Sequence, residues 1–199
     1  MSLTLTTAPT VEPVLLDEAK AHMRIAPDDH DDDAYITAAI VAAREFVEAH
    51  TSRALITQTW TWKLDDFPPC DQFRVPKAPL SSITSIAYVD TAGDSQTWAA
   101  SNYAVDAPSG PRAQPGTISL VYEKTYPTVR GQRNAVTVVF VAGYGAAGTS
   151  VPNVCRQAML LLIGEMYERR EEGLIGASVA EVPLSVSRLL ASTVSGGWD

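Results

Sequence analysis

The order of helix-forming and strand-forming segments is the feature that most constrains this fold. Apolar residues recur at helical spacing over residues 14–51 and again over residues 152–172. The stretch between them is rich in Thr, Val and aromatic residues and ends in the run VTVVFVAGYG. The two helical segments are expected to pack on each other, so the β-rich stretch is predicted to be an insertion between them. The fold class that follows is α+β.

Local signals set the expected helix boundaries. Pro27 is expected to end the first helix, and Pro152 suits the first turn of the third helix. A stripe of small and apolar residues predicts the buried face of the second helix: Ile36, Ala39, Ile40, Ala43, Phe46 and Val47. The sequence predicts a helical bundle with helices near residues 14–25, 33–51, 152–171 and 184–192.

The central stretch predicts a small antiparallel subdomain of short strands. The segment LITQTWTWKLDDF alternates in twos, and turn signals such as FPPCD and TAGDSQ separate the segments that follow. A hairpin is expected around Ala92, Gly93 and Asp94. The further strands are expected near residues 73–75, 83–90, 96–98, 103–106, 117–122 and 135–142. The expected domains are residues 1–55 plus 146–199 for the helical bundle and residues 56–145 for the β-rich insertion.

The chain is acidic, and the charge is uneven. Its formal net charge is −8, and residues 1–50 hold ten Asp and Glu against three Lys and Arg, which gives −7. Such a chain does not bind nucleic-acid backbones tightly, because that affinity comes from Lys and Arg. The N-terminus lacks a signal-peptide pattern, and MLLLIG is too short to span a membrane. Cys70 and Cys155 are expected to be reduced thiols in a cytoplasmically made protein.

Candidate chemical sites are few. The acidic run DDHDDD at residues 28–33 offers carboxylates for Ca²⁺ or Mg²⁺, but lacks the glycine and the closing acidic residue of a calcium loop. One of its aspartates is instead expected to cap the following helix, and the others to favour the helix dipole. Asp65 and Asp66 could serve as acid and base, but a turn before Pro68 explains them more simply. The sequence therefore predicts no cofactor, no metal and no enzymatic activity.

Three further groups have either a structural or a binding interpretation. The strand aromatics (Trp60, Trp62, Trp98, Tyr103 and Tyr122) could pack a core or form a ligand platform. Arg130 and Arg133 could lie in a solvated loop, or contact DNA or an acidic neighbour. A charged cluster could form local ion pairs or contacts between subunits. It comprises Glu168, Arg169, Arg170, Glu171 and Glu172.

The chain resembles the head–tail connector (adaptor) family of long-tailed bacteriophages and gene transfer agents. The resemblance lies in the order and spacing of several segments rather than in one motif. These segments are VEPVLLDEAKAHMRI, the acidic run leading into DDAYITAAIVAAREFVEAHTSRALITQTW, AVTVVFVAGYG, VPNVCRQAMLLLIGEMYERRE and VPLSVSRLLA. Together they cover nearly the whole chain.

The resemblance implies a structural virion protein at the head–tail junction, or neck, synthesised in the bacterial host. Such proteins form a ring, usually of twelve copies, between the portal protein and a stopper or tail-completion protein, with double-stranded DNA passing through the lumen. No membrane is involved. The resemblance also implies that the C-terminal segment from Pro183 to Asp199 reaches the portal. Its expected anchors are Leu184, Val186, Leu189, Leu190 and Trp198.

Two alternative functions remain at this point. One is another neck or tail component of the stopper type, which a mostly β chain without flanking helices would favour. The other is a hydrolase that uses Asp65 and Asp66.

Overall fold

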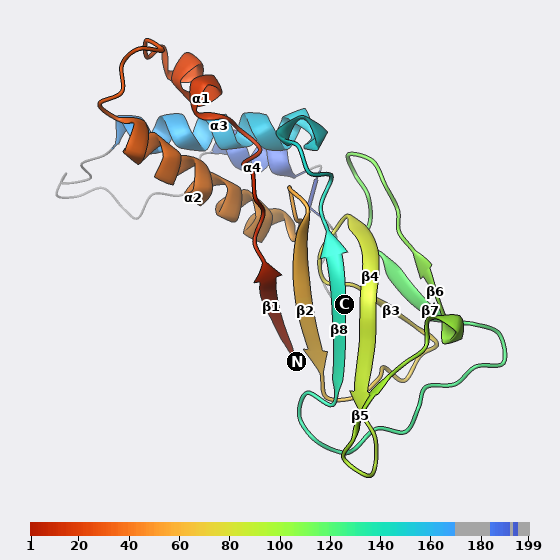
Figure 1. Cartoon of the computed structure of the whole chain (residues 1–199). Coiled ribbons are helices and arrows are strands. Elements are labelled where there is room, and N and C mark those ends of the chain that lie inside the picture. Colours follow the sequence, from red (N-terminus) through yellow and green to blue (C-terminus); the bar gives the residue numbers. More distant parts are fainter. Residues whose placement is uncertain (170–183, 192, 195–199) are drawn as a thin grey trace. The chain divides into compact units, whose positions relative to one another are not determined.

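The chain divides into two compact units. The computed structural model describes residues 1–169, 184–191 and 193–194 (Figure 1). The first of the two units, here called the sheet unit, comprises Met1–Pro9 and Thr57–Tyr144. The second, here called the helical unit, comprises Thr10–Ile56 and the chain from Gly145 onward.

The helical unit contains the four predicted helices. The first helix is followed by Arg24 and the second helix by Ser52. Both residues adopt a left-handed backbone, with φ of 61° and 55°, which ends each helix. The first helix therefore ends at Met23, and Pro27 is not the residue that ends it. The helices are α1 (Leu16–Met23), α2 (Asp33–Thr51), α3 (Asn153–Glu168) and α4 (Leu184–Leu190), with the 3₁₀ turn η2 (Gly148–Ser150) before α3. The α+β class predicted from the sequence is confirmed.

The core of the helical unit forms where α2, α3 and α4 turn their apolar faces inward. Five of the six predicted stripe residues of α2 are buried, whereas Phe46 is only half-buried and stacks on His50. Helix α3 is buried over most of its circumference because it packs against α1, α2 and α4. It contributes Cys155, Ala158, Met159, Leu160, Leu162 and Ile163.

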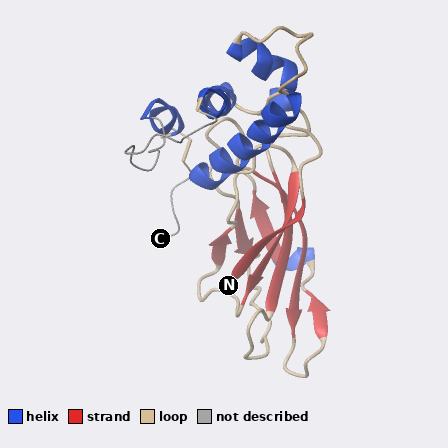
Figure 2. Ribbon diagram, turned by 90° about the vertical axis from the view of Figure 1, so that its left-hand side faces the viewer, coloured by secondary structure: helices blue, strands red, loops and turns tan. Residues whose placement is uncertain are grey.

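The sheet unit consists of two antiparallel sheets, whose strands are red in Figure 2. The larger sheet has the strand order β1-β2-β8-β4-β5, and the smaller has the order β3-β7-β6. The predicted hairpin is the β4–β5 connection, where Asp90 and Asp94 pair across the turn. The strands are β1 (Ser2–Thr7), β2 (Gln58–Leu64), β3 (Gln72–Arg74), β4 (Leu80–Val89), β5 (Ser95–Thr97), β6 (Tyr103–Asp106), β7 (Thr117–Leu120) and β8 (Val136–Ala142). The 3₁₀ turn η1 (Ala100–Asn102) precedes β6.

The N-terminal segment differs from the expected domain boundary. Residues 1–9 belong to the sheet unit rather than to the helical one, because β1 pairs antiparallel with β2. Its register places Leu3 opposite Trp62 and Leu5 opposite Trp60. The Thr-rich composition suggested only an extended segment, since the pairing partner lies more than fifty residues away in the sequence.

Side chains alternate between the two faces of β2, as the sequence predicted. Trp62 is 5% exposed, while Thr59 and Thr61 on the other face are half-exposed. Trp62 belongs to an aromatic cluster of the sheet unit. The other members of this cluster are Phe67, Phe73, Tyr88, Trp98, Tyr103 and Tyr126. Phe67 and Tyr126 stack with ring centroids 4.7 Å apart. Burial raises the pKa of Tyr126 to about 12, and its hydroxyl donates to the Cys70 carbonyl.

The backbone at Gly116 lies close against the side chain of Leu80. A Cβ at residue 116 would lie 2.3 Å from Leu80 Cδ2 and 2.5 Å from Leu80 Cβ, and Leu80 is itself buried. We expect Gly116→Ala to destabilise the protein by about 1–3 kcal/mol, because Leu80 has no space to move into. Urea unfolding followed by tryptophan fluorescence would measure this.

Gly131→Ala is the matched control. A Cβ at residue 131 would have no heavy atom within 4 Å. Its effect should stay within about 0.5 kcal/mol, as for most surface substitutions. Equal stabilities for the two variants would contradict the tight packing at Gly116.

Candidate assembly surfaces

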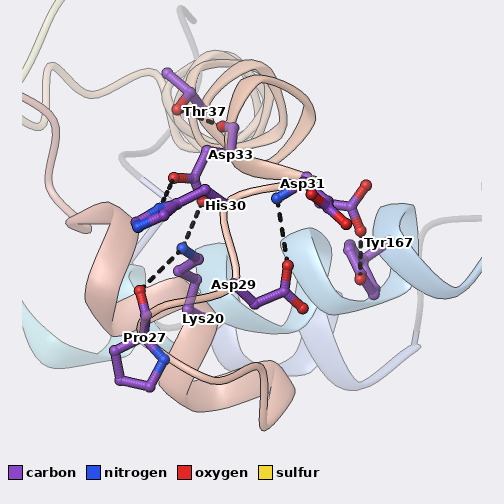
Figure 3. A network of polar contacts seen from close by, with 9 residues as sticks. Lys20, Pro27, Asp29, His30, Asp31, Asp33, Thr37 and Tyr167 are labelled. Atoms are coloured by element: carbon purple, nitrogen blue, oxygen red, sulfur yellow. Dashed lines mark hydrogen bonds and ion pairs between the residues drawn. The ribbon is translucent and has the colours of Figure 1, made fainter.

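The acidic run of residues 28–33 joins helices rather than forming an open carboxylate site. Asp33 Oδ1 lies 2.6 Å from the Lys20 ammonium of α1, and Asp33 Oδ2 lies 2.8 Å from His30 Nδ1 (Figure 3). Asp32 Oδ2 accepts a 2.7 Å hydrogen bond from the hydroxyl of Tyr167 on α3 (Figure 3). The two aspartates therefore tie the start of α2 to both neighbouring helices.

The expected side-chain cap of α2 is wrong. Asp32 occupies the N-cap position, but its side chain makes no capping hydrogen bond. The carboxylate turns to Tyr167 instead, since that hydroxyl belongs to a helix packed alongside. The second part of the expectation holds, because Asp33 lies in the first turn of α2, where the helix dipole favours a negative charge.

A weak signal in the sequence could have identified Lys20 as the partner of Asp33. Lys20 is 2% exposed and lies on the same face of α1 as Leu16 and Met23, three or four residues away. A charged residue at an apolar position of an amphipathic helix is the pattern of a buried cation that needs a counter-ion. The Lys20 ammonium also approaches the Pro27 carbonyl at 3.5 Å.

A second buried charge network lies on the C-terminal half of α2. The Arg44 guanidinium donates to Glu12 at 2.9 Å and to Glu48 at 3.1 Å. Glu48 Oε1 in turn accepts the Leu55 N–H at 2.7 Å, which fixes the chain just after the helix. The i,i+4 spacing of Arg44 and Glu48 was visible in the sequence, but their burial was not.

Arg53 fixes the chain that follows α4. Its side chain is 1% exposed, and its Nε donates to the Thr193 carbonyl at 2.5 Å. The Cys155 thiol lies nearby, and burial raises its pKa. Nothing in the sequence pairs residues 53 and 193, which are 140 positions apart.

The expected portal anchors have different environments. Val186 and Leu190 are fully buried and belong to the core of the helical unit. Leu184 is 64% exposed, and Leu189 is half-exposed. Trp198 lies outside the described residues. An exposed apolar residue that the sequence did not single out is Val194, which is 45% exposed.

The charged end of α3 is only partly described. Glu168 and Arg169 are exposed, and Arg169 forms a 2.9 Å ion pair with Glu165 one turn earlier. Arg170, Glu171 and Glu172 lie outside the described residues. The local i,i+4 interpretation therefore applies to Arg169.

Each of the two candidate catalytic aspartates accepts a hydrogen bond from a backbone N–H group. Asp65 Oδ1 accepts the Asn134 N–H at 2.8 Å, and Asp66 Oδ1 accepts the Phe67 N–H at 2.7 Å. Arg133 lies near Asp65 at a small surface pocket formed with the N-terminal residues Met1 and Ser2. The Asp66 contact is local, as in the turn that the sequence favoured, whereas the Asp65 contact joins the chain after β2 to the chain before β8.

The strand aromatics divide between core and surface. Trp62 and Trp98 are buried in the aromatic cluster, and Trp98 stacks on Tyr103 with centroids 5.1 Å apart. Trp60 faces the Lys77 ammonium, which lies 5.1 Å from its ring centroid. Tyr122 is different, because 86% of it is exposed.

The described ranges contain neither a metal-ligand cluster nor a helix that could span a membrane. Within residues 1–169, 184–191 and 193–194, no three His, Cys, Asp or Glu side chains gather as a metal site would require. In those same residues, no helix has the length and apolar character that a membrane crossing demands.

A family model matches part of the chain. Residues 13–102 match the family model described as phage gp6-like head-tail connector protein. No curated protein sequence gives a significant match. The family model confirms the resemblance to head–tail connector proteins that the segment order predicted.

Solved structures extend the similarity to the whole chain. A chain in the neck of an empty gene transfer agent particle, computed with C6 symmetry, matches at a TM-score of 0.80 and 26% identity. A chain in the virion of a native gene transfer agent particle matches equally. A chain in the native neck, computed with C12 symmetry, matches at a TM-score of 0.74 and 25% identity. Each match covers 100% of this chain and 97% of the other.

Asp33→Asn should lower the unfolding temperature, because it leaves the buried Lys20 ammonium without its counter-ion. The Lys20 hydrogen bond and then the His30 hydrogen bond lower the pKa of Asp33 below its ordinary value of 3.8. The stabilisation is therefore fully present above pH 3.8 and is lost as the pH falls through the lowered pKa. Thermal melts from pH 7 downward would show the two proteins converging at acid pH.

Asp31→Asn is the control for this substitution, because Asp31 is exposed and only its backbone N–H is bonded, to Asp29. It should melt close to the unsubstituted protein. An Asp33→Asn variant that melts like Asp31→Asn at pH 7 would contradict a stabilising role for the Lys20–Asp33 ion pair.

Proposed function

We propose that this chain is a structural head–tail adaptor of a phage or gene transfer agent particle, located in the neck between head and tail. The observation that carries this function is the full-length similarity at a TM-score of 0.80 to a chain of a gene transfer agent neck. The family model for head–tail connectors supports it independently over residues 13–102. Helices and sheets are both included in the match, which favours an adaptor over a mostly β stopper.

The adaptor is a ring of identical copies. Particle necks that contain the similar chains were computed with C6 and C12 symmetry, and the twelve copies expected from the resemblance agree with the latter. A closed ring uses heterologous contacts, in which two different surfaces of each copy meet. Many such contacts acting together make even weak ones sufficient.

The partners on either side are the portal protein and a stopper or tail-completion protein. The C-terminal segment reaches the portal through exposed apolar residues. Burial narrows the described candidates to Leu184, Leu189 and Val194, since Val186 and Leu190 are already covered within the helical unit. Trp198 remains a further candidate.

Double-stranded DNA passes through the ring without sequence-specific binding. The net charge of −8 supports this, because an acidic protein does not release phosphate counterions and does not retain the duplex. The role is structural rather than enzymatic. Asp65 and Asp66 are engaged in separate backbone contacts, which argues against their use as an acid–base pair.

Removal of the gene from a producer strain tests the position in the particle. We expect electron microscopy to show separate tails beside tailless heads, because the joint between them is missing. Restoring the gene should restore complete particles. Complete particles in the strain that lacks the gene would overturn the adaptor function.

Leu184→Asp tests the portal contact without removing any core residue. We expect at least a tenfold loss of affinity for purified portal rings, since a charge replaces an exposed apolar side chain of α4. Ser185→Asp is the matched control, being exposed and adjacent, and should bind within about twofold of the unsubstituted protein.

Deletion of residues 195–199 tests Trp198 separately and leaves Thr193 in place for Arg53. Deletion from residue 184 is a poorer test, because it removes Val186 and Leu190 from the core. Unchanged portal binding by both Leu184→Asp and the five-residue truncation would remove the C-terminal segment as the anchor.

A further inference from the structure

Strands β1 and β6 are two of the four edge strands of the sheet unit. All residues of this unit are described, and β1 pairs only with β2, while β6 pairs only with β7. No backbone hydrogen bond of the sheet unit reaches the other edge of either strand. Each strand therefore presents a row of backbone N–H and C=O groups that can pair with another strand.

Neither edge carries the usual protection against pairing. The β1 sequence SLTLTT contains no charged residue and no proline, and its register is regular over Ser2–Leu5 before an irregularity at Thr6. The β6 sequence YAVD has one charge, Asp106, at its end. Edge strands that must stay single are normally kept so by Lys, Pro or an early bulge.

The exposed apolar side chains of the unit gather at the same two places. The sheet unit has five exposed large hydrophobic residues. Met1 and Leu5 lie at β1, with Leu5 39% exposed. Val105 lies on β6 and is 39% exposed, while Val121 and Tyr122 directly follow β7, the partner of β6. The Val121 N–H bonds to the Asn102 carbonyl, which keeps Val121 beside the start of β6, on the side that pairs with β7.

The other two edge strands lack this combination. Strand β5 (Ser95–Thr97) has three residues, all exposed and none apolar. Strand β3 (Gln72–Arg74) also has three residues, and its exposed side chains are Gln72 and Arg74. Only β6 matches the four-residue regular run of β1 in length and in exposed apolar character.

We propose that copies of this chain join by pairing the β1 edge of one copy with the β6 edge of the next. In Figure 1 these strands lie on opposite sides of the sheet unit, so one copy can use both at once. Backbone hydrogen bonds between edges fix the register, as in β-strand addition. Pairing also covers Leu5 and Val105. The proposal rests on the proposed ring, because a ring requires two different surfaces on each copy.

Disulfide trapping tests this contact directly. The full-length chain would carry Thr4→Cys and Ala104→Cys, which are exposed and central in the two edges. Cys70→Ser removes the exposed native thiol, while Cys155 is fully buried and can stay. Assembled rings, formed on portal or isolated from particles, would be oxidised and run on a non-reducing gel.

We expect a ladder that extends beyond dimers, because each copy is linked to a neighbour on both sides. Either cysteine alone should give no more than dimers. Closed rings that give no ladder, or rings that are trapped instead by Thr4→Cys with Gln96→Cys on β5, would overturn the β1–β6 contact and leave the adaptor function intact. Absence of the protein from rings and from particle necks would overturn both.

A charge at the edge gives a second and independent readout. Thr4→Glu should raise the concentration needed for ring assembly at least tenfold, since a charged side chain opposes strand addition. Thr57→Glu is the matched control, because Thr57 is exposed, lies in the same unit and precedes β2 rather than lying on a free edge. Circular dichroism should show both variants folded. Assembly of Thr4→Glu at the normal concentration would overturn the proposal.

Discussion

Pairing between β2 and β8 is the interaction on which the two-unit architecture depends. The register joins Gln58 to Ala142 and Leu64 to Val136, so the first and last long strands of the insertion lie side by side. The chain therefore enters and leaves the sheet unit at neighbouring points, although 84 positions of sequence separate Gln58 from Ala142. An insertion with adjacent ends can be added between two helices without separating them, because it requires no long connection back.

In the helical unit, buried charged side chains join one segment to another. Lys20, Arg44, Glu48 and Arg53 are all nearly covered, and such groups are costly to bury unless they are paired. Each of them meets an oppositely charged group or a backbone group on a segment outside its own helix. Removing one partner of such a pair is costly because it leaves an uncompensated buried charge, although an apolar pair of similar volume would pack without a desolvation cost.

The proposed neck function agrees with the exposed strand edges and exposed apolar side chains of the described residues. An enzyme concentrates perturbed polar groups in a pocket, whereas the described residues here leave strand edges and scattered apolar side chains exposed. The β1 and β6 edges belong to the sheet unit, and the exposed residues Leu184 and Val194 belong to the helical unit. Contacts between copies and contact with the portal can thus use different parts of the chain.

The sequence by itself determined the elements that depend on local physics. Helix α2 spans the predicted residues 33–51, and the β4–β5 hairpin turns where Gly93 and its neighbours were expected to turn it. Periodicity and turn chemistry are properties of neighbouring residues, so they can be recognised without a partner. Only the tertiary structure decided that residues 2–7 form a sheet edge, that Val186 and Leu190 are core residues, and that Asp32 bonds Tyr167 instead of capping its helix. These outcomes depend on segments outside the element concerned. Burial and pairing are then settled by what packs against a residue rather than by the residue's own neighbours in the sequence.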